Sequence, residues 1–353
     1  MNAALLPTTD ARAELVAALR AGRSDARHRF AAVVAGGAVL ALAFFFANLL
    51  VGLPTRIGLA DALWAITGRA RGLANFVVFE TRLPRAVGAL LAGVLFGVSG
   101  HLYQRVVRNP LATPDIIGIT SGATAGAVAA IVLAPSVPLG VQAAGLLGAL
   151  LATAVVFALT WRGGLDTYRL VLVGIGVSAV GVAVTSYLLT FADRMAIAAV
   201  LRWSTGTASY VQWPDAGLLA IVLAVAVVAV LPLVSGLSAL GLGDDLARGL
   251  GVRVVAVRVV VLVVGAVAAA LTTSVVGPIG FVALIAGPIA ARLAPRGPHL
   301  LPAALVGAVL VLSADLAAQQ LPPIAPVPTG VLTGLVGAPV FVWLLLRSRA
   351  GAA

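Results

Sequence analysis

The sequence predicts an all-α, polytopic membrane protein with about ten transmembrane helices. Three observations favour this fold class. The chain of 353 residues is 61% hydrophobic, whereas soluble domains are about half apolar. Only 10% of its residues are charged, and these fall in short clusters between long apolar runs. Such clustering is expected where each charge in the bilayer centre costs several kcal/mol.

The apolar runs divide the chain into spans, since a helix needs about 20 mostly apolar residues to cross the hydrocarbon core. The run 253–294 is too long for one helix, and GPIG at 277–280 supplies the break. No loop is long enough for a separate soluble domain, although 54–81 and 195–212 could each hold a short interfacial helix. The predicted spans lie near residues 31–53, 83–104, 116–134, 139–161, 168–191, 215–234, 253–273, 276–294, 300–317 and 329–346.

Arginine positions predict that both termini lie on the cytoplasmic side. All 23 basic residues are arginine, and an N-in, C-in arrangement puts 16 of them on inner segments and seven on outer ones. This bias follows the positive-inside rule. We expect a polar cytoplasmic arm at 1–30, a ten-helix transmembrane domain at 31–347 and a cytoplasmic tail at 348–353. The arm leads into a retained first helix, not a cleaved signal peptide.

Composition excludes several functions. Cysteine is absent, which excludes disulfides, thiol catalysis and cysteine-bound metals. The absence of lysine excludes a Walker A motif, so any ATP hydrolysis belongs to another chain. The net charge of +11 does not indicate nucleic-acid binding, because the arginines lie at helix ends rather than on one soluble face.

Catalytic and metal-binding patterns are also missing from the sequence. His28, His101 and His299 are the only histidines, and they are far apart with no paired carboxylates at ligand spacing, so we expect no metal site. No Ser/His/Asp order and no H-E-x-x-H occurs, which predicts that the protein is not an enzyme.

A few residues within the spans have recognisable roles. Gly93 and Gly97 form a G-x-x-x-G pair, as do Gly122 and Gly126, and predict close helix packing. Two acids lie nearest the spans. Asp115 follows a proline at a predicted helix start, where a capping role is expected. Asp315 lies near the outer end of a span, where a functional role and a structural hydrogen bond are both open.

The inner segment 237–258 differs from the other loops because it predicts a short surface helix. Glycines bracket the run, acids open it and an arginine lies toward its end, which suits the helix dipole. Such a helix could receive force from a partner protein, or be a helical turn without one. The residues concerned are Asp244, Asp245, Leu246, Ala247, Arg248, Leu250 and Gly251.

Seven stretches follow one known family pattern, in order and over nearly all of the chain from residue 82. They are RLPR (82–85), SGHLYQRVVRNPLATPDIIGITSGA (99–123), RWSTG (202–206), LGDDLARGLGV (242–252), GPIGFVALIAGPIAAR (277–292), LPAALVGAVLVLSADLAAQ (301–319) and PTGVLTGLVGAPVFVWLLLR (328–347). Together they resemble the FecCD-type permeases, which are the membrane subunits of ABC importers for ferric siderophores, haem and vitamin B12. These stretches are more similar to those of the ferric-enterobactin type than to those of the B12 type.

The resemblance implies a BtuC-like type II importer permease in the cytoplasmic (inner) membrane. In that family, two permease subunits of ten helices each surround one path, above an ABC ATPase dimer and below an extracytoplasmic substrate-binding protein. The two permeases here could be identical or different. The chain itself would bind no cofactor, and ATP and Mg would bind the partner ATPase.

The resemblance also assigns roles to individual residues. The segment 242–252 would be the coupling helix that docks on the ATPase. Arg82 and Arg85 would meet acidic residues of the binding protein, and Gln319 replaces a frequent docking arginine. The inner turn into the third helix would contain Asn109, Pro110 and Asp115.

The resemblance therefore implies a permease subunit that translocates an iron(III)-siderophore, driven by a separate ATPase. A vitamin B12 or haem permease of the same family is the nearest alternative. A secondary transporter driven by an ion gradient belongs to a different class, and would need coupling charges or broken helices at mid-membrane. A scaffold subunit without its own transport path is a third possibility.

Overall fold

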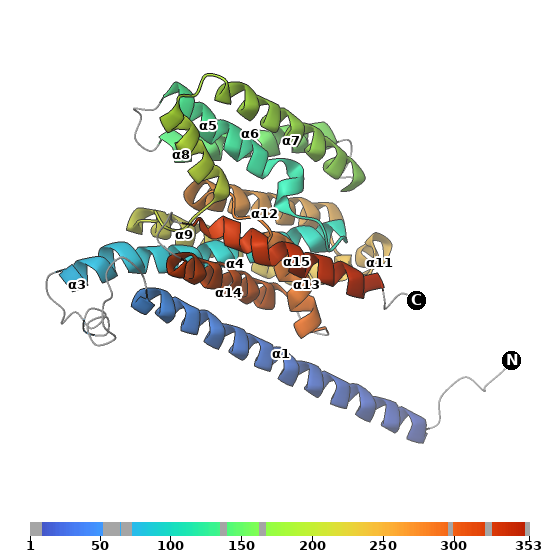
Figure 1. Ribbon diagram of the computed structural model, residues 1–353. Helices are drawn as coiled ribbons and strands as arrows, with labels where there is room; N and C mark the ends of the chain where they lie inside the picture. The colour runs from blue at the N-terminus through green and yellow to red at the C-terminus, as the bar shows by residue number, and fades with distance from the viewer. Residues whose placement is uncertain are drawn as a thin grey trace.

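The computed structural model describes residues 9–51, 64, 73–134, 140–161, 167–295, 299–321 and 327–349, and these residues form helices and no β-strand (Figure 1). The long helices are α1 (Thr9–Val51), α4 (Leu83–Val107), α6 (Gly140–Thr160), α7 (Thr167–Leu189), α9 (Trp213–Val230), α12 (Val254–Val276), α14 (Leu300–Gln320) and α15 (Thr329–Arg349). The shorter ones are α3 (Leu73–Phe76), η1 (Val77–Arg82), η2 (Pro114–Ile117), α5 (Ile119–Leu133), α8 (Arg194–Thr205), η3 (Leu231–Leu233), α10 (Val234–Leu240), α11 (Asp244–Gly249) and α13 (Val282–Leu293).

Each predicted span corresponds to an apolar helix. In the described part of the chain, seven helices are long and apolar enough to cross a membrane. The remaining three predicted spans are the shorter apolar helices Ile119–Leu133, Val282–Leu293 and Thr329–Leu344. The fold class predicted from composition is therefore confirmed.

The boundary between the polar arm and the first span is not a break in the structure. α1 is one continuous helix of 43 residues from Thr9 to Val51. No proline interrupts it, and a single helix-interior glycine costs only about 1 kcal/mol. Of the two segments that could hold a short interfacial helix, 195–212 contains a helix, α8. The loop 54–81 ends in α3 and η1, and most of its earlier part lies outside the described residues.

The predicted break after α12 is confirmed, but it is longer than expected. The predicted span 276–294 becomes helical only at Val282. Gly277 and Phe281 have φ values of +71° and +66°, and such left-handed backbone stops a right-handed helix. α13 thus has 12 residues, or about 18 Å of helix, which is shorter than the hydrocarbon core of about 30 Å.

Pro288 lies inside α13, and a side chain from α4 compensates for it. A proline has no N–H, so it leaves the carbonyl four residues earlier without its helical partner. That carbonyl belongs to Leu284, and Gln104 Nε2 donates to it at 2.9 Å. Gly287 makes room, because a Cβ there would collide with the Gln104 Oε1 atom. The short helix is therefore held by α4.

Both predicted glycine pairs allow two helix backbones to touch. A Cβ on Gly93 would collide with the Gly307 carbonyl oxygen of α14, and one on Gly97 with that of Ala303. The pair in α5 packs against α6 in the same way: Gly122 and Gly126 face Gly148 and Ala144. The prediction of close packing is confirmed, and α4 is the central helix of the bundle.

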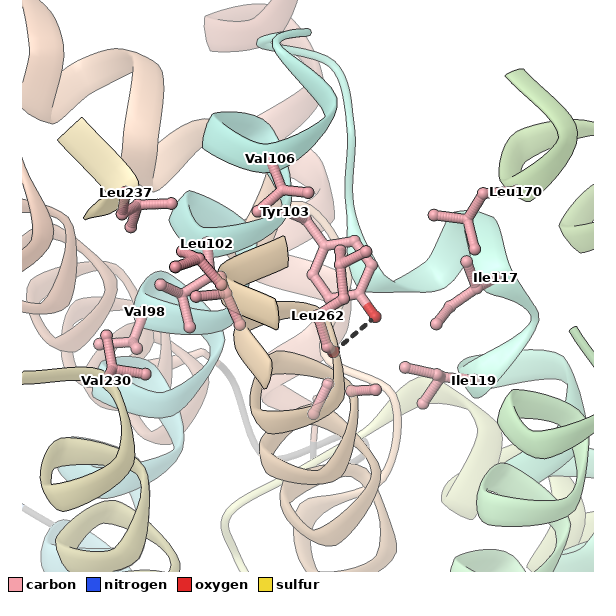
Figure 2. Close-up of a cluster of buried hydrophobic side chains, with 14 of the residues drawn as sticks. Val98, Leu102, Tyr103, Val106, Ile117, Ile119, Leu170, Val230, Leu237 and Leu262 are labelled. Carbon is pink, nitrogen blue, oxygen red and sulfur yellow. Dashed lines mark hydrogen bonds between the residues drawn. The ribbon is translucent and has the colours of Figure 1, made fainter. Parts of the chain in front are cut away.

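A core at one end of the bundle joins many helical segments, among them α4, α7, α10, α12 and η2 (Figure 2). Tyr103 of α4 is 1% exposed, and its hydroxyl donates to the Leu262 carbonyl of α12 at 3.1 Å. Leu237 of α10 and Leu170 of α7 pack in the same cluster, with Ile117 of η2. This core fixes α10, and with it the segment leading into α11, against the transmembrane helices.

The two ends of the bundle carry different elements. Figure 1 shows the beginning of α1, the end of α15 and α11 at one end, and α3 at the opposite end. We refer to the α11 end as the inner end and to the α3 end as the outer end.

Candidate functional site

Two polar assemblies occupy opposite ends of the bundle, and the first is built on α11. The predicted helix is present and spans Asp244–Gly249, so it ends one residue before the expected Leu250. Gly243 and Gly251 flank it with φ values of +114° and +79°, which only glycine adopts without strain. The predicted tight turns at both ends are therefore confirmed.

Asp244 joins α11 to two long helices. Arg258 Nη2 of α12 lies 3.1 Å from each carboxylate oxygen, and Arg108, which follows α4, forms a second ion pair with Asp244. Burial alone would raise the pKa of Asp244, but the charges and hydrogen bonds of Arg258 and Arg108 outweigh it and lower that pKa below its ordinary value. The carboxylate thus stays charged, and a displacement of α11 pulls on both α4 and α12.

Arg108 is itself fixed by the backbone. Its φ of +54° ends α4, and its Nε donates to the Leu240 carbonyl at 2.9 Å. The sequence predicted Asp244 as part of the coupling segment and as a favourable charge for the helix dipole, but not as an ion-pair partner. It missed this ion pair because Arg108 lies 136 residues away in the chain.

One face of α11 packs against the bundle, and the other is exposed. Ala247 is completely buried, whereas Leu246 and Leu250 are 62% and 66% exposed. Leu242 precedes them at the same spacing of four and is 62% exposed. Arg248 and Asp245 form an ion pair of 2.9 Å between side chains that are 59% and 100% exposed, which contributes little. The outward face is therefore an apolar strip.

The inner turn between α4 and α5 is close to its predicted form. Asn109 Oδ1 accepts a hydrogen bond from the Leu111 backbone N–H at 2.9 Å, and this bond closes an Asx-turn around Pro110. The expected capping role of Asp115 is wrong. Its carboxylate accepts from the Thr120 hydroxyl instead, and Thr113 occupies the position before η2. Proline at 114 had suggested a helix start, but η2 is a single 3₁₀ turn.

An inner cavity of about 300 Å³ lies beside this turn, lined among others by Arg105, His101 and His299. The two histidines were expected to be far apart, yet their ring centroids are 6.0 Å apart, because α13 and the start of α14 fold back onto α4. His299 lies before α14, and burial lowers its pKa. Among the described residues, no group of three or more His, Asp or Glu side chains could hold a metal ion.

The outer end contains a buried polar network centred on Asp315, which is completely buried. Arg85 Nε and Nη2 donate to its two carboxylate oxygens at 2.8 and 3.0 Å. Thr329 Oγ1 donates to it at 2.8 Å, and Gln319 Nε2 at 3.1 Å. Gln319 also donates to Asn48 Oδ1 at 2.7 Å. The network therefore links α1, α4, α14 and α15, and Asp315 has a structural role.

The three residues predicted to dock a binding protein all have partners inside the chain. Arg85 and Gln319 both donate to Asp315. Arg82 is 4% exposed, and its Nη1 donates to the Leu49 carbonyl at 2.7 Å. Docking by these residues stays a prediction. The internal contacts are a second role that no sequence pattern indicated, since the partners lie up to 271 residues apart.

This chain is similar to known proteins over most of its length. The family model described as the FecCD transport family matches residues 39–347. The ferric enterobactin permease FepG of Escherichia coli is 37% identical over 80% of this chain and 86% of its own length. The achromobactin permease CbrC of Dickeya dadantii is also 37% identical, over 82% of this chain and 83% of its own. The cobalamin permease BtuC of Halobacterium salinarum is 38% identical, over 77% and 74%.

A solved structure has the same architecture. It is a metal-chelate type ABC transporter in an inward-facing conformation, with a TM-score of 0.77 and 27% sequence identity. The superposition covers 90% of this chain and 99% of that one. The helical order described above is therefore that of an importer permease.

Proposed function

Because this chain belongs to the FecCD transport family, whose members are membrane permeases of ABC importers and not enzymes, we propose that it carries an iron(III)-siderophore across the cytoplasmic membrane. Two of its relatives are named for ferric enterobactin and Fe(3+)-citrate, and another for achromobactin. All three are at least 35% identical to it. The energy comes from ATP hydrolysis, with ATP and Mg bound by a separate ATPase dimer.

The observation that carries the ATP-driven mechanism is the anchoring of α11. The helix presents Leu246 and Leu250 outward, while Asp244 ties it to α4 and α12. Coupling needs a rigid element that passes a displacement from one site to another. When the ATPase closes, the apolar strip moves with it, and the two ion pairs transmit that motion to α4 and α12.

The remaining partners follow from the same proposal. A second permease subunit, identical or different, completes the transport path, and an extracytoplasmic binding protein delivers the chelate to the outer end. Arg82, Arg85 and Gln319 lie at that end, and Arg85 keeps 18% of its side chain exposed. Through it, the outer network would sense the docked binding protein.

A cobalamin permease is the second candidate. It is favoured by the relative BtuC, whose 38% identity matches that of the siderophore permeases. The central path is set by the same fold in both cases, so substrate choice needs a direct measurement.

Transport itself tests the proposal. The chain is expressed with its ATPase and binding protein, and uptake of ⁵⁵Fe-labelled siderophore is compared with that of labelled cobalamin. We expect siderophore uptake that stops when the ATPase carries a substitution in its Walker A lysine and continues when an ionophore collapses the ion gradient.

The opposite pattern, with uptake lost to the ionophore and indifferent to the ATPase substitution, identifies a secondary transporter. Uptake of cobalamin alone selects the second candidate. If neither solute enters while the complex is assembled, the chain is a scaffold and the proposal is wrong.

Topology is a separate expectation. The arginine distribution predicts that both termini are cytoplasmic, which puts the α11 end of the bundle inside. Reporter fusions after residues 110 and 245 should give a cytoplasmic signal, and fusions after 75 and 205 an external one. A cytoplasmic signal at 205, or an external one at 245, would refute this orientation.

A further inference from the structure

An apolar groove of about 400 Å³ separates α1 from α13 and α14. Every residue that lines it is alanine, glycine, valine, leucine, isoleucine or proline. Figure 1 shows the N-terminal half of α1 standing apart from the rest of the bundle, and the α1 residues that line the groove lie between Ala32 and Leu40. In a membrane, an open apolar groove between helices is filled from the lipid phase.

Small side chains on α1 create this groove. Ala32, Gly36 and Leu40 recur at a spacing of four and share one face of the helix. A Cβ on Gly36 would meet no atom within 4 Å, whereas one on Gly37 would lie 3.2 Å from the Leu305 side chain of α14. α1 therefore rests on α14 at Gly37 and leaves open space beside Gly36.

A basic side chain adjoins the inner end of the groove. Arg29 Nε donates to the Leu293 carbonyl at the end of α13 at 2.9 Å, and Leu293 also lines the groove. Within the described residues, this is the one hydrogen bond that the exposed Arg29 guanidinium makes.

The spacing of these features fits one class of ligand. Arg29 and Leu40 are eleven positions apart, which is about 16 Å along a helix. Half of the hydrocarbon core is about 15 Å thick, so the groove reaches from the level of Arg29 to about the bilayer centre. The guanidinium nitrogens that do not bond Leu293 suit the oxygens of a phosphate group.

We propose that this groove binds a diacyl phospholipid with an anionic headgroup. One acyl chain lies along Gly36 and Leu40, and the phosphate is held by Arg29. The bound lipid fills the space between α1 and α14 and fixes the angle at which α1 leaves the bundle. The site depends on the membrane orientation of α1 and not on which solute is transported.

The test is lipid retention by the purified protein, measured by native mass spectrometry after exchange into detergent with equal phosphatidylglycerol and phosphatidylcholine. We expect wild type to retain phosphatidylglycerol with a preference of roughly tenfold, the effect of one charge-assisted contact. A Cβ on Gly36 meets no atom within 4 Å, so Gly36→Leu should occupy the groove and lose retained lipid of both kinds. Arg29→Gln should lose the preference, because the net charge that distinguishes the two lipids then has no guanidinium beside it, and Arg29→Lys should restore it.

Gly217→Leu is the matched control, because a Cβ on Gly217 of α9 also meets no atom within 4 Å. It should retain lipid as wild type does. Gel filtration checks that each variant is folded, and if Gly36→Leu is not, Ala32→Leu replaces it. The proposal is overturned if the groove variant retains as much lipid as Gly217→Leu. It is also overturned if inorganic phosphate displaces the lipid, since the site would then recognise a free anion and not a lipid.

Discussion

Replacing Leu246 with aspartate will abolish ATP-driven uptake while the permease remains folded and inserted. Leu246 is 62% exposed on the outward face of α11, so its loss removes no contact from the core. A partner that buries this face would have to bury an unpaired carboxylate, which costs about 3–5 kcal/mol. The docked population then falls by more than about a hundredfold. The measurement is ATPase activity stimulated by loaded binding protein in proteoliposomes, together with uptake.

Leu321→Asp is the control for this substitution. Leu321 follows α14 at the outer end and is 41% exposed, so the same chemical change there should leave coupling intact. Gly251→Pro is a second, independent disruption, since proline cannot adopt the φ of +79° at this position. Wild-type ATPase stimulation and uptake in both Leu246→Asp and an assembled Gly251→Pro variant would show that α11 is not the coupling element.

Asp315→Asn will lower the stability of the protein by about 3–5 kcal/mol, because it leaves the Arg85 guanidinium largely buried without its counter-charge. The two side chains are 18% and 0% exposed, so water can replace the lost partner only in part. Thr329 would also lose a charged acceptor. Thermal unfolding in detergent, followed by circular dichroism, measures the change. The double variant Arg85→Gln with Asp315→Asn should recover part of the loss, since it removes both charges.

Asp245→Asn provides the comparison. It removes the same charge from an ion pair with Arg248 whose aspartate is 100% exposed, and such pairs contribute about 0–1 kcal/mol. Equal stability of Asp315→Asn and Asp245→Asn would contradict a structural role for the outer network. Asp315→Asn also leaves Arg85 charged. Unchanged capture of the binding protein by this variant would separate docking by Arg85 from its structural role.

Local features of the chain were predictable because they depend on adjacent residues. A helix in lipid satisfies its backbone hydrogen bonds within its own segment, so an apolar run of sufficient length predicts a span wherever it lies. The same reasoning holds for α11, because the turns at Gly243 and Gly251 depend only on these glycines and on their neighbours in the sequence. The close packing at Gly93 and Gly97 was also predictable, since small residues at that spacing expose the backbone of one helix face.

The length of α13 was less predictable. Apolar composition predicted a full span, but the left-handed Phe281 delays the start of the helix, and its Pro288 is tolerated only because Gln104 replaces the lost hydrogen bond. Phe281 has no sequence signature for a positive φ, and Gln104 lies 180 residues away from the carbonyl that it bonds.

The sequence alone determined the spans, their number, the inner surface helix and the absence of an ATP-binding motif, because each is a property of a continuous segment or of composition. Only the tertiary structure decided what the charged residues do. Asp244 pairs with Arg108 and Arg258, and Asp315 pairs with Arg85. Charged groups at the ends of an apolar bundle are stabilised by a counter-charge, most strongly where they are buried, as Asp315 is. Which partner they find depends on which helix faces meet, and packing between distant segments decides that.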